Sequence, residues 1–327
     1  MVATARAAAN IAFVKYWGNR CPALNLPANS SISLTLSNCT AVTTVAVDGS
    51  LNEDVVYYGT SLANDAVTAR VRRFLGAVRQ RARREEKARV QTSNNFPVGC
   101  GIASSAAGFA ALALAASRAY GLLLDTQELS CLARLGSGSA CRSVLGGFVE
   151  WVAGTSHETS CARQLADHDH WPELRDIVVI VSKAPKEQSS SEGHALAPTS
   201  PLYEARLAYL GAVLETTRRA IATRDLRLLG EVLEPEAFCL HAIAMTTSRP
   251  VLYWTPETVD VLRRVFEWRR QGLEAYCTLD AGPNVHIITV AEVAAELVPR
   301  LRAHGYNELI VDRPGPGAQL LSQPPPQ

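Results

Sequence analysis

The chain has 327 residues and a formal net charge of +1, and 47% of its residues are hydrophobic while 19% are charged. This composition predicts a soluble globular protein with one large or two small domains. The small net charge provides no overall attraction to nucleic acid or to membranes. No stretch approaches the ~20 uncharged apolar residues that span a bilayer, and residues 1–10 contain no apolar signal-peptide core. We therefore expect a cytoplasmic protein with no membrane partner.

Alternating small, apolar and polar residues predict β-strands in the first part of the chain, at residues 4–16, 30–37 and 41–47. A helix is predicted over residues 65–89. Its many arginines are compatible with a nucleic-acid patch, but Glu85 and Glu86 favour a solvated, charge-rich helix end. We therefore expect no nucleic-acid partner.

Residues 96–108 form a Gly-rich loop that leads into an Ala-rich stretch at 104–119. The Ala-rich stretch is apolar nearly all round, which predicts a buried helix. Asp125 or Thr126 should cap a further helix that ends near Gly136. Two strands are then expected, at residues 146–152 and 176–183.

After Lys183 the chain changes character and begins a polar loop at residues 184–193. Later helices are predicted at residues 201–223, 225–245, 256–271 and 291–303, and strands at 273–279, 285–290 and 307–312. Because strands and helices are mixed in both halves, the predicted fold class is α+β. We expect an N-terminal domain, a C-terminal domain and a disordered tail, at residues 1–184, 185–316 and 317–327.

The first stretch with chemical character is PVGCGIASSAAG at residues 97–108. Gly99 and Gly101 let the backbone approach a ligand, and the N-terminus of the following helix favours an anion. The hydroxyls of Ser104 and Ser105 suit phosphate oxygens or a magnesium ion. The lysine of the Walker pattern is absent, so this would be a different nucleotide loop. The alternative is a tight turn before a packed helix.

The second stretch is GSGSACRS at residues 136–143. Ser137 and Ser139 provide two hydroxyls, and the guanidinium of Arg142 can bind a carboxylate or a phosphate through two parallel hydrogen bonds. The alternative is a Gly-rich turn between helices with an exposed arginine.

Two further stretches place polar groups at the ends of predicted strands. In TLDAGPNVH, Asp280 lies on a turn, where catalytic groups are common, although a turn-forming aspartate is the alternative. In ANIAFVKYWG, Asn10 and Lys15 are five residues apart and would face opposite sides of a regular strand. A bend or bulge is required before both can line one site.

In order and spacing, NIAFVKYWG, NLPANSSISLTL, NNFPVGCGIASSAAG, GSGSACRS and DAGPN resemble the mevalonate 5-phosphate and mevalonate 5-diphosphate decarboxylases. These enzymes belong to the superfamily of galactokinase, homoserine kinase, mevalonate kinase and phosphomevalonate kinase. The resemblance covers residues 4–315. It implies a two-lobed small-molecule kinase fold, with an N-terminal half like ribosomal protein S5 domain 2, a C-terminal α+β half and a cleft between them. It also implies a homodimer.

The resemblance implies a reaction in which ATP phosphorylates a tertiary C3 hydroxyl, after which phosphate and CO2 leave. ATP and Mg2+ are the implied cofactors. The implied catalytic residues are Asp280, which orients or deprotonates the hydroxyl, Lys15 near the transferred phosphoryl group, and Arg142 with Asn10 on the C1 carboxylate. The implied substrate-binding residues are Tyr16, Asn19, Arg20, Ser137, Ser139, Ser189 and Ser190. The implied ATP-binding residues are Asn94, Pro97, Gly99, Gly101, Ala103, Ser104 and Ser105, with Ser105 also facing the metal.

Asn19 departs from the family pattern, which usually has KYWGK at this point with the lysine on the terminal phosphate of the diphosphate. Losing one charge-assisted hydrogen bond costs roughly 1.5–3 kcal/mol, or about tenfold to a hundredfold in affinity. The sequence therefore favours mevalonate 5-phosphate as the substrate and isopentenyl phosphate as the product. Mevalonate 5-diphosphate is the alternative if Arg20 or the 184–193 loop compensates. A plain small-molecule kinase without decarboxylation is a more remote alternative.

Overall fold

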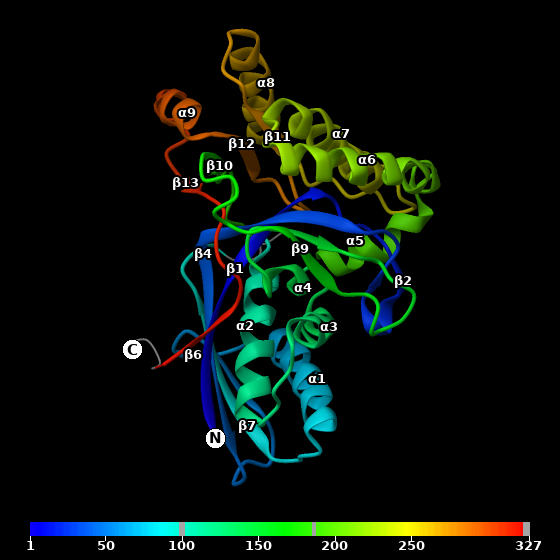
Figure 1. Ribbon diagram of the computed structural model, residues 1–327, viewed down its shortest axis with the longest axis vertical. Helices are drawn as coiled ribbons and strands as arrows, with labels where there is room; N and C mark the ends of the chain where they lie inside the picture. Colours follow the sequence, from blue (N-terminus) through cyan, green and yellow to red (C-terminus); the bar gives the residue numbers. More distant parts are fainter. Residues whose placement is uncertain (98–101, 185–187, 323–327) are drawn as a thin grey trace.

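The computed structural model describes residues 1–97, 102–184 and 188–322, which form two sheets, one in the lower and one in the upper part of Figure 1. The larger sheet has eight strands, with the order β14-β1-β4-β7-β5-β6 and with β8 and β9 joined to β4. Its strands are β1 (Val2–Val14), β4 (Ser31–Asp48), β5 (Val55–Tyr58), β6 (Ser61–Leu62), β7 (Lys87–Asn94), β8 (Phe148–Trp151), β9 (Ala162–Ala166) and β14 (Gln319–Leu321). A small ribbon of β2 (Asn19–Cys21) and β3 (Leu26–Pro27) stands beside it.

Four helices cover the larger sheet, namely α1 (Asp65–Ala82), α2 (Ser104–Ala119), α3 (Thr126–Gly136) and α4 (Ala140–Ser143). The Ala-rich helix α2 lies against β1 and β4, with most of its side chains buried, as its sequence predicts. Helix α3 begins after Asp125, whose carboxylate accepts the backbone N–H of Glu128 in a capping box, which confirms the predicted cap. These helices therefore bring Ala103 and residues 137–139 to the same end of α2.

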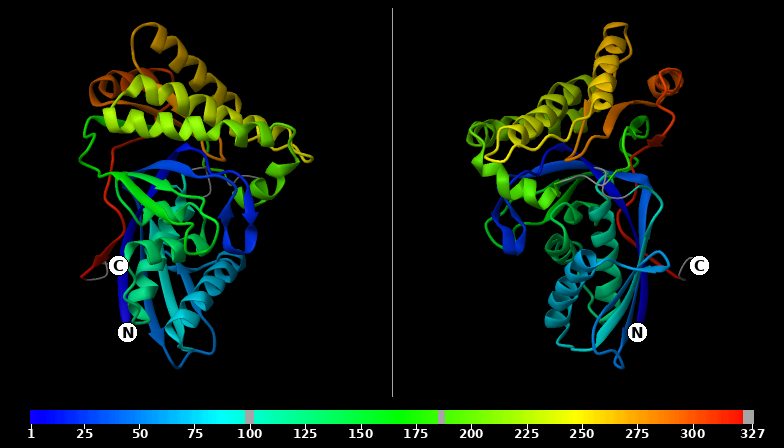
Figure 2. Two further views of the ribbon diagram at one scale, coloured as in Figure 1. Left: turned by 45° about the vertical axis from the view of Figure 1, so that its right-hand side comes forward. Right: turned by 180° about the vertical axis from the view of Figure 1, so that it is seen from behind.

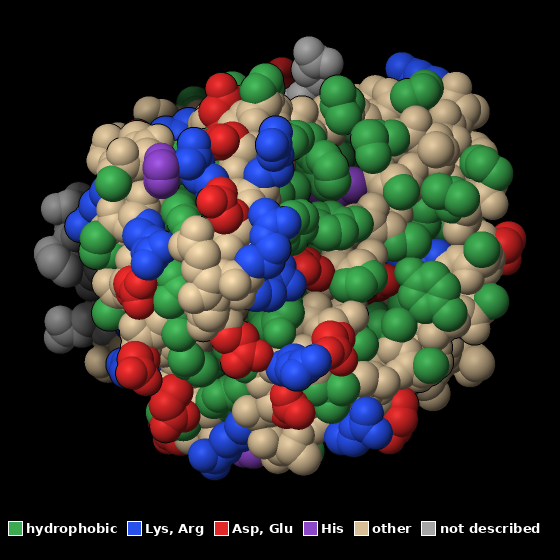
Figure 3. Space-filling view, turned by 90° about the horizontal axis from the view of Figure 1, so that it is seen from above, with side chains coloured by type: hydrophobic (Ala, Val, Ile, Leu, Met, Phe, Trp, Pro, Cys, Tyr) green, Lys and Arg blue, Asp and Glu red, His purple; other side chains and the backbone are tan. Residues whose placement is uncertain are grey.

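The upper sheet has the order β11-β12-β10-β13 and consists of β10 (Leu174–Val179), β11 (Tyr276–Thr278), β12 (Val285–Val290) and β13 (Leu309–Asp312). Its helices are α5 (Ser190–Leu196), α6 (Tyr203–Thr223), α7 (Leu226–Met245), α8 (Pro256–Arg270) and α9 (Ala291–Ala303). Figure 2 shows α6 and α7 side by side above the lower sheet, and both contact β1. Seen from above, the outer face of these helices carries charges of both signs, intermingled (Figure 3).

Two early predictions about secondary structure are wrong in detail. The helix predicted over 65–89 ends at Ala82 because Arg83 adopts a left-handed conformation with φ 52°, and residues 87–94 form β7. The strands predicted at 30–37 and 41–47 are one strand, β4, because it pairs with β1 along its length and with β8 and β7 at its two ends. Strands β5 and β9 were not predicted from the sequence.

Sheet membership divides the chain at a point different from the predicted residue 184. Strand β10 precedes that residue, yet it pairs with β12 and β13 in the upper sheet. The chain therefore leaves the lower sheet after β9 and returns to it only with β14, which pairs with β1. The prediction of a disordered tail is wrong for residues 319–321, and residues 323–327 lie outside the described part of the chain.

Candidate active site

Strand β1 carries the bend that Asn10 and Lys15 require. Its register against β4 shifts between Ala8 and Asn10, and again between Ala12 and Val14. The second irregularity lies between the two polar residues, so their side chains need not follow the strict alternation of a regular strand. Lys15 then follows the last residue of the strand. The irregularity between Ala12 and Val14 is therefore the bend or bulge that the spacing of Asn10 and Lys15 predicted.

Lys15 and Asp280 form an ion pair across the two sheets, although they are 265 positions apart. The Lys15 Nζ lies 2.8 Å from Asp280 Oδ1 and also donates to the carbonyl of Ala12 at 2.7 Å. The lysine side chain is 1% exposed, whereas that of Asp280 is 23% exposed. The carboxylate therefore remains partly accessible although its lysine partner is buried.

Burial and mutual attraction set the charges of this pair. Burial lowers the pKa of Lys15 below its usual 10.5, and the attraction of Asp280 offsets part of that effect. Burial alone would raise the pKa of Asp280, but the charge and hydrogen bond of Lys15 outweigh it and hold the pKa below 3.8. Asp280 is therefore a carboxylate at neutral pH and a weak base, which suits it to orient a hydroxyl more than to remove its proton.

The GSGSACRS stretch does form a turn between helices α3 and α4, but Arg142, on the short helix α4, is buried rather than exposed, so that part of the alternative is wrong. Its Nη2 donates to Asn10 Oδ1 at 3.0 Å, its Nε to Ser33 Oγ at 2.9 Å and its Nη1 to Ser31 Oγ at 2.6 Å. Asn10 in turn donates to Ser143 Oγ at 2.8 Å. Burial lowers the pKa of Arg142 from its usual 12.5. Hydrogen bonds to neutral groups of β1 and β4 therefore hold the Arg142 guanidinium in place.

Ser31 and Ser33 are site residues that the sequence analysis missed. Both lie in β4, and Ser31 pairs with Trp151 and Ser33 with Val149 in β8. Their spacing of two residues puts both hydroxyls on one face of the strand, which is a signal the SSISLTL stretch contained. The signal was too common to interpret alone, because alternating serines also occur on ordinary sheet surfaces.

Tyr16, Asn19 and Arg20 lie close together but differ in their surroundings. The Tyr16 hydroxyl donates to Asn19 Oδ1 at 2.5 Å, and burial raises the pKa of Tyr16. Arg20 is exposed, and its Nη2 donates to the carbonyl of Ala153 at 3.0 Å and to that of Gly154. Arg20 is therefore tied to the loop after β8, which makes it a poor replacement for the missing lysine at position 19.

The serines of the 136–143 stretch connect the two predicted binding loops. Ser137 Oγ lies 3.1 Å from Ser105 Oγ at the start of α2. A Cβ on Gly138 would lie 2.6 Å from the Tyr16 ring, so a glycine is required where this loop crosses the tyrosine. The carbonyl of Ser139 accepts from Asn10 Nδ2 at 3.1 Å. The structure therefore brings these serines to the site.

Ser189 and Ser190 open helix α5, which lies against the KYWG segment. Ser189 is the N-cap, and its hydroxyl is bonded in a capping box with Glu192. Further along the same helix, the His194 ring lies 4.0 Å from the Tyr16 ring, and its Nδ1 accepts the Gly18 N–H at 3.0 Å. The helix start therefore stands near the predicted substrate site, with Ser189 engaged in capping.

Three of the predicted ATP-binding residues, Ala103, Ser104 and Ser105, lie at the start of α2. Asn94 ends β7, Pro97 follows it, and Gly99 and Gly101 lie outside the described residues. Ala103 has a left-handed φ of 48° and supplies no side-chain cap to the helix that Ser104 and Ser105 begin. An N-terminus without a side-chain cap, beside two serines, fits a phosphate group with its metal ion. Ser105 is the residue in this group that would bind the metal ion.

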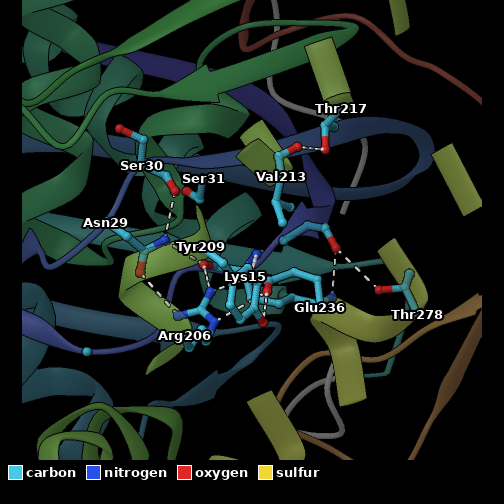
Figure 4. A network of polar contacts seen from close by, with 12 residues as sticks. Lys15, Asn29, Ser30, Ser31, Arg206, Tyr209, Val213, Thr217, Glu236 and Thr278 are labelled. Carbon is cyan, nitrogen blue, oxygen red and sulfur yellow. Dashed lines mark hydrogen bonds and ion pairs between the residues drawn. The ribbon is translucent and has the colours of Figure 1, made fainter. Parts of the chain in front are cut away.

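Three residues that the sequence analysis missed hold the main chain of Lys15. They are Asn29, before β4, Arg206 on α6 and Glu236 on α7, and Figure 4 shows them converging on Lys15. No local pattern indicates this role, because the three residues come from distant parts of the chain.

Arg70, on α1, is a further missed residue. Its Nε donates to the carbonyl of Gly136 at 2.9 Å, and its guanidinium lies 4.6 Å from the centre of the Phe109 ring. Gly136 immediately precedes the serine loop, so Arg70 places a cation beside Ser137. The arginine-rich character of residues 70–89 was read only as a solvated face or a nucleic-acid patch.

The described residues contain no group of three or more His, Cys, Asp or Glu side chains that could hold a metal ion. Among the described helices, none combines the length and apolar character needed to cross a membrane. His241, on α7, is buried against Tyr253 and Trp254, and burial lowers its pKa to about 3, so it stays neutral.

Two lobes that meet at an acid–lysine pair, with a serine-bearing loop at a helix N-terminus, define an enzyme of the small-molecule kinase superfamily. The family model described as the diphosphomevalonate decarboxylase-like N-terminal domain matches residues 7–162, and that of the mevalonate 5-diphosphate decarboxylase C-terminal domain matches residues 176–310. The chain belongs to the diphosphomevalonate decarboxylase family.

Individual relatives agree with this assignment over nearly the whole chain. The diphosphomevalonate decarboxylase of Candida albicans is 36% identical over 301 residues, which are 87% of this chain and 83% of that protein. The human diphosphomevalonate decarboxylase is 35% identical over 93% of this chain and 80% of its own length. The solved structure of the mevalonate diphosphate decarboxylase from Enterococcus faecalis has a TM-score of 0.93, 37% identity and 99% coverage of both chains. The fold predicted from the resemblance is thereby confirmed.

Proposed function

We propose that the protein is an ATP- and Mg2+-dependent decarboxylase that converts mevalonate 5-diphosphate to isopentenyl diphosphate, releasing ADP, phosphate and CO2. The observation that carries the proposal is the Lys15–Asp280 pair beside the buried cation Arg142. The relatives named above are diphosphomevalonate decarboxylases, and a solved structure with 37% identity is MDDEF in complex with MVAPP, AMPPCP and magnesium. These relatives favour the diphosphate, which was the alternative, over the monophosphate reading of Asn19.

The chain's own groups suit the two halves of this reaction. When bound, ATP supplies the phosphoryl group, and Mg2+ neutralises the charge on its phosphates. Asp280 accepts the hydrogen bond of the C3 hydroxyl and aims its oxygen at the phosphoryl group. Lys15, protonated beside Asp280, stabilises the negative charge on the group in transfer. Ser104, Ser105 and the N-terminus of α2 hold the phosphates.

The decarboxylation step depends on Arg142 and Asn10. A carboxylate leaves as CO2 most readily when its C–C bond is aligned with the bond to the departing phosphate, so the carboxylate must be held in one orientation. The rigid guanidinium of Arg142, bonded to Asn10, Ser31 and Ser33, provides fixed donors for that purpose.

Arg70 supports a diphosphate substrate despite Asn19. It is bonded to the carbonyl of Gly136, and Gly138, two residues further, crosses the Tyr16 ring whose hydroxyl binds Asn19. Burial lowers the pKa of Arg70 from its usual 12.5, and the neighbouring charge of Arg73 adds to that effect. Arg70 therefore provides a cation beside the loop that contacts Tyr16, the partner of the neutral Asn19.

The test is an ADP-release assay with ATP and Mg2+ that compares mevalonate 5-diphosphate with mevalonate 5-phosphate while CO2 is collected. We expect a higher kcat/KM for the diphosphate and one CO2 for each ADP. A preference for the monophosphate would restore the first reading of Asn19. ADP without CO2 would make the protein a plain kinase and overturn the proposal.

The Arg70→Met variant sharpens the assay. Because it removes a cation from the tail of the substrate, KM for the diphosphate should rise by about tenfold, with a smaller rise for the monophosphate. Arg81→Met, at the far end of the same helix and paired with Glu128, is the control and should leave both KM values unchanged.

A homodimer and a cytoplasmic location both stay predictions. Light scattering would test whether the protein is a dimer.

A further inference from the structure

In the described part of the chain, the hydrogen bonds to the main chain of Lys15 come from side chains. Lys15 follows the last residue of β1, so no strand partner binds its peptide groups. Its N–H donates to Glu236 Oε1 at 3.0 Å. Its carbonyl accepts from Arg206 Nη2 at 2.7 Å and from Asn29 Nδ2 at 2.9 Å. The direction in which the lysine side chain leaves the backbone is therefore set by these three residues.

Arg206 and Glu236 form an ion pair whose side chains are both 0% exposed. Their contact is bidentate, with Arg206 Nη2 on Glu236 Oε1 and Nε 3.4 Å from Oε2. Arg206 Nη1 also reaches Asn29 Oδ1 at 3.3 Å, which closes a ring of bonds around the carbonyl of Lys15 (Figure 4). The pair comes from α6 and α7 of the upper lobe, while Lys15 and Asn29 belong to the lower one.

Fold stability is a weak explanation for this pair. Removing two charges from water costs several kcal/mol per ion, and well-packed apolar residues often replace such pairs without loss of stability. A pair that instead binds both the N–H and the C=O of one residue has a geometric consequence. Rotation of either peptide group would swing the Lys15 ammonium away from Asp280, since among the described residues Nζ donates to Asp280 and to the Ala12 carbonyl alone.

We propose that Arg206 and Glu236 are positioning residues for Lys15, and that they hold its main chain so that the ammonium meets Asp280 and the phosphoryl group in transfer. The proposal rests on the proposed function in assigning Lys15 to that transfer. If so, helices of the upper lobe set the geometry of a lysine from the lower sheet. Lys15 is then placed for catalysis only when the two lobes are correctly docked.

A second buried carboxylate provides a matched control. Glu150 in β8 is 2% exposed, and it binds Arg218 of the same helix α6, with Nη2 at 2.7 Å from Oε1 and Nε at 2.9 Å from Oε2. This pair also ties α6 to the lower sheet, but neither residue contacts Lys15. Loss of either carboxylate weakens the junction between the lobes, whereas only loss of Glu236 releases Lys15.

The experiment compares Glu236→Gln with Glu150→Gln in the full chain. We expect Glu236→Gln to lower kcat by about tenfold or more, the equivalent of one charged hydrogen bond, with a smaller change in the KM for ATP. The two variants should lower Tm by similar amounts. Glu150→Gln, however, should leave kcat within about twofold of the wild type, as expected for an unperturbed site. An unchanged kcat in Glu236→Gln, or an equal loss in both variants, would overturn the proposal.

A second measurement requires no turnover. The chain has four lysines, so the side-chain NMR signals of lysine-labelled protein can be assigned by substitution. Because the charge of Glu236 raises the pKa of Lys15, Glu236→Gln should lower that pKa and shift the Lys15 signal, while Glu150→Gln should change neither. An identical Lys15 titration in wild type and Glu236→Gln would refute the positioning role. If the wild type used neither substrate, the proposed function alone would fail, and the titration would still test the positioning role.

Asn29→Ala keeps the proposal testable if Glu236→Gln fails to fold. It removes one donor to the Lys15 carbonyl while the ion pair stays intact. We expect kcat to fall by about threefold to tenfold, the loss of one neutral hydrogen bond, with a displaced Lys15 signal. Wild-type kcat together with a wild-type signal would show that the bonds to this carbonyl do not position Lys15.

Discussion

Lys15 and Arg142 are buried cations at the junction of the sheets, and their hydrogen-bond partners differ in charge. Lys15 is neutralised by a carboxylate, Asp280, at 2.8 Å. In the described part of the chain the hydrogen bonds of Arg142 go only to neutral groups, namely Asn10, Ser31 and Ser33. Among these described residues no carboxylate is hydrogen-bonded to Arg142 that an incoming carboxylate would have to displace, while Lys15 and Asp280 form a neutral unit that a phosphoryl group must share.

The difference teaches how one site can serve two steps. A buried cation without a counter-ion costs more to fold and binds an anion more strongly, because no internal partner has to be displaced. A paired cation remains protonated and oriented but attracts an anion less. The Arg142 side of the site thus suits tight, fixed binding of a carboxylate, and the Lys15 side suits charge that appears only during transfer.

The largest expected effect comes from substituting Asp280, the carboxylate that pairs with Lys15. Asp280→Asn should lower kcat by about 10²- to 10⁴-fold, the range for a group that acts on the reacting proton. It also leaves Lys15 buried without its counter-ion, so the Lys15 pKa should fall further. Single-turnover assays with wild type as reference would measure this, and a kcat within about tenfold of wild type would remove Asp280 from the reaction.

The next effect comes from the unpaired cation. Arg142→Lys keeps the charge but loses the fork that binds Asn10, Ser31 and Ser33 together, so we expect a loss of about tenfold to a hundredfold in kcat/KM. If Arg142 holds the carboxylate in the decarboxylation step, the ratio of CO2 to ADP should also fall below one. A ratio that stays at one with unchanged kcat/KM would assign Arg142 to structure alone.

The smallest effect is a pH dependence of wild-type kcat. Lys15 is active as a cation, and its pKa is lowered from 10.5, so kcat should fall as pH rises, with a midpoint below 10.5. Asp280 is active as an anion, and its pKa is lowered from 3.8, so it should cause no loss of kcat until the pH falls below 3.8. An acidic loss centred near pH 6 that persists in His194→Gln would contradict this assignment.

Some of the local structure was predictable because it depends on neighbouring residues. The Ala-rich run at 104–119 is buried as α2, and Asp125 caps α3 as its spacing to Glu128 requires. Helix 65–89 was predicted too long because the left-handed turn at Arg83 has no marker such as glycine. Strands β5 and β9 have only four and five residues, so the alternation within each was too short for periodicity alone to define them.

The sequence by itself determined the family, through motifs whose order and spacing are readable without a fold, and it predicted Asp280, Lys15, Arg142 and Asn10 as site residues. Only the tertiary structure decided how these residues are held. The bend in β1, the bonds of Arg142 to Ser31 and Ser33, and the buried Arg206–Glu236 pair all join segments from distant parts of the chain. Such contacts depend on how sheets and helices dock, which local periodicity does not encode.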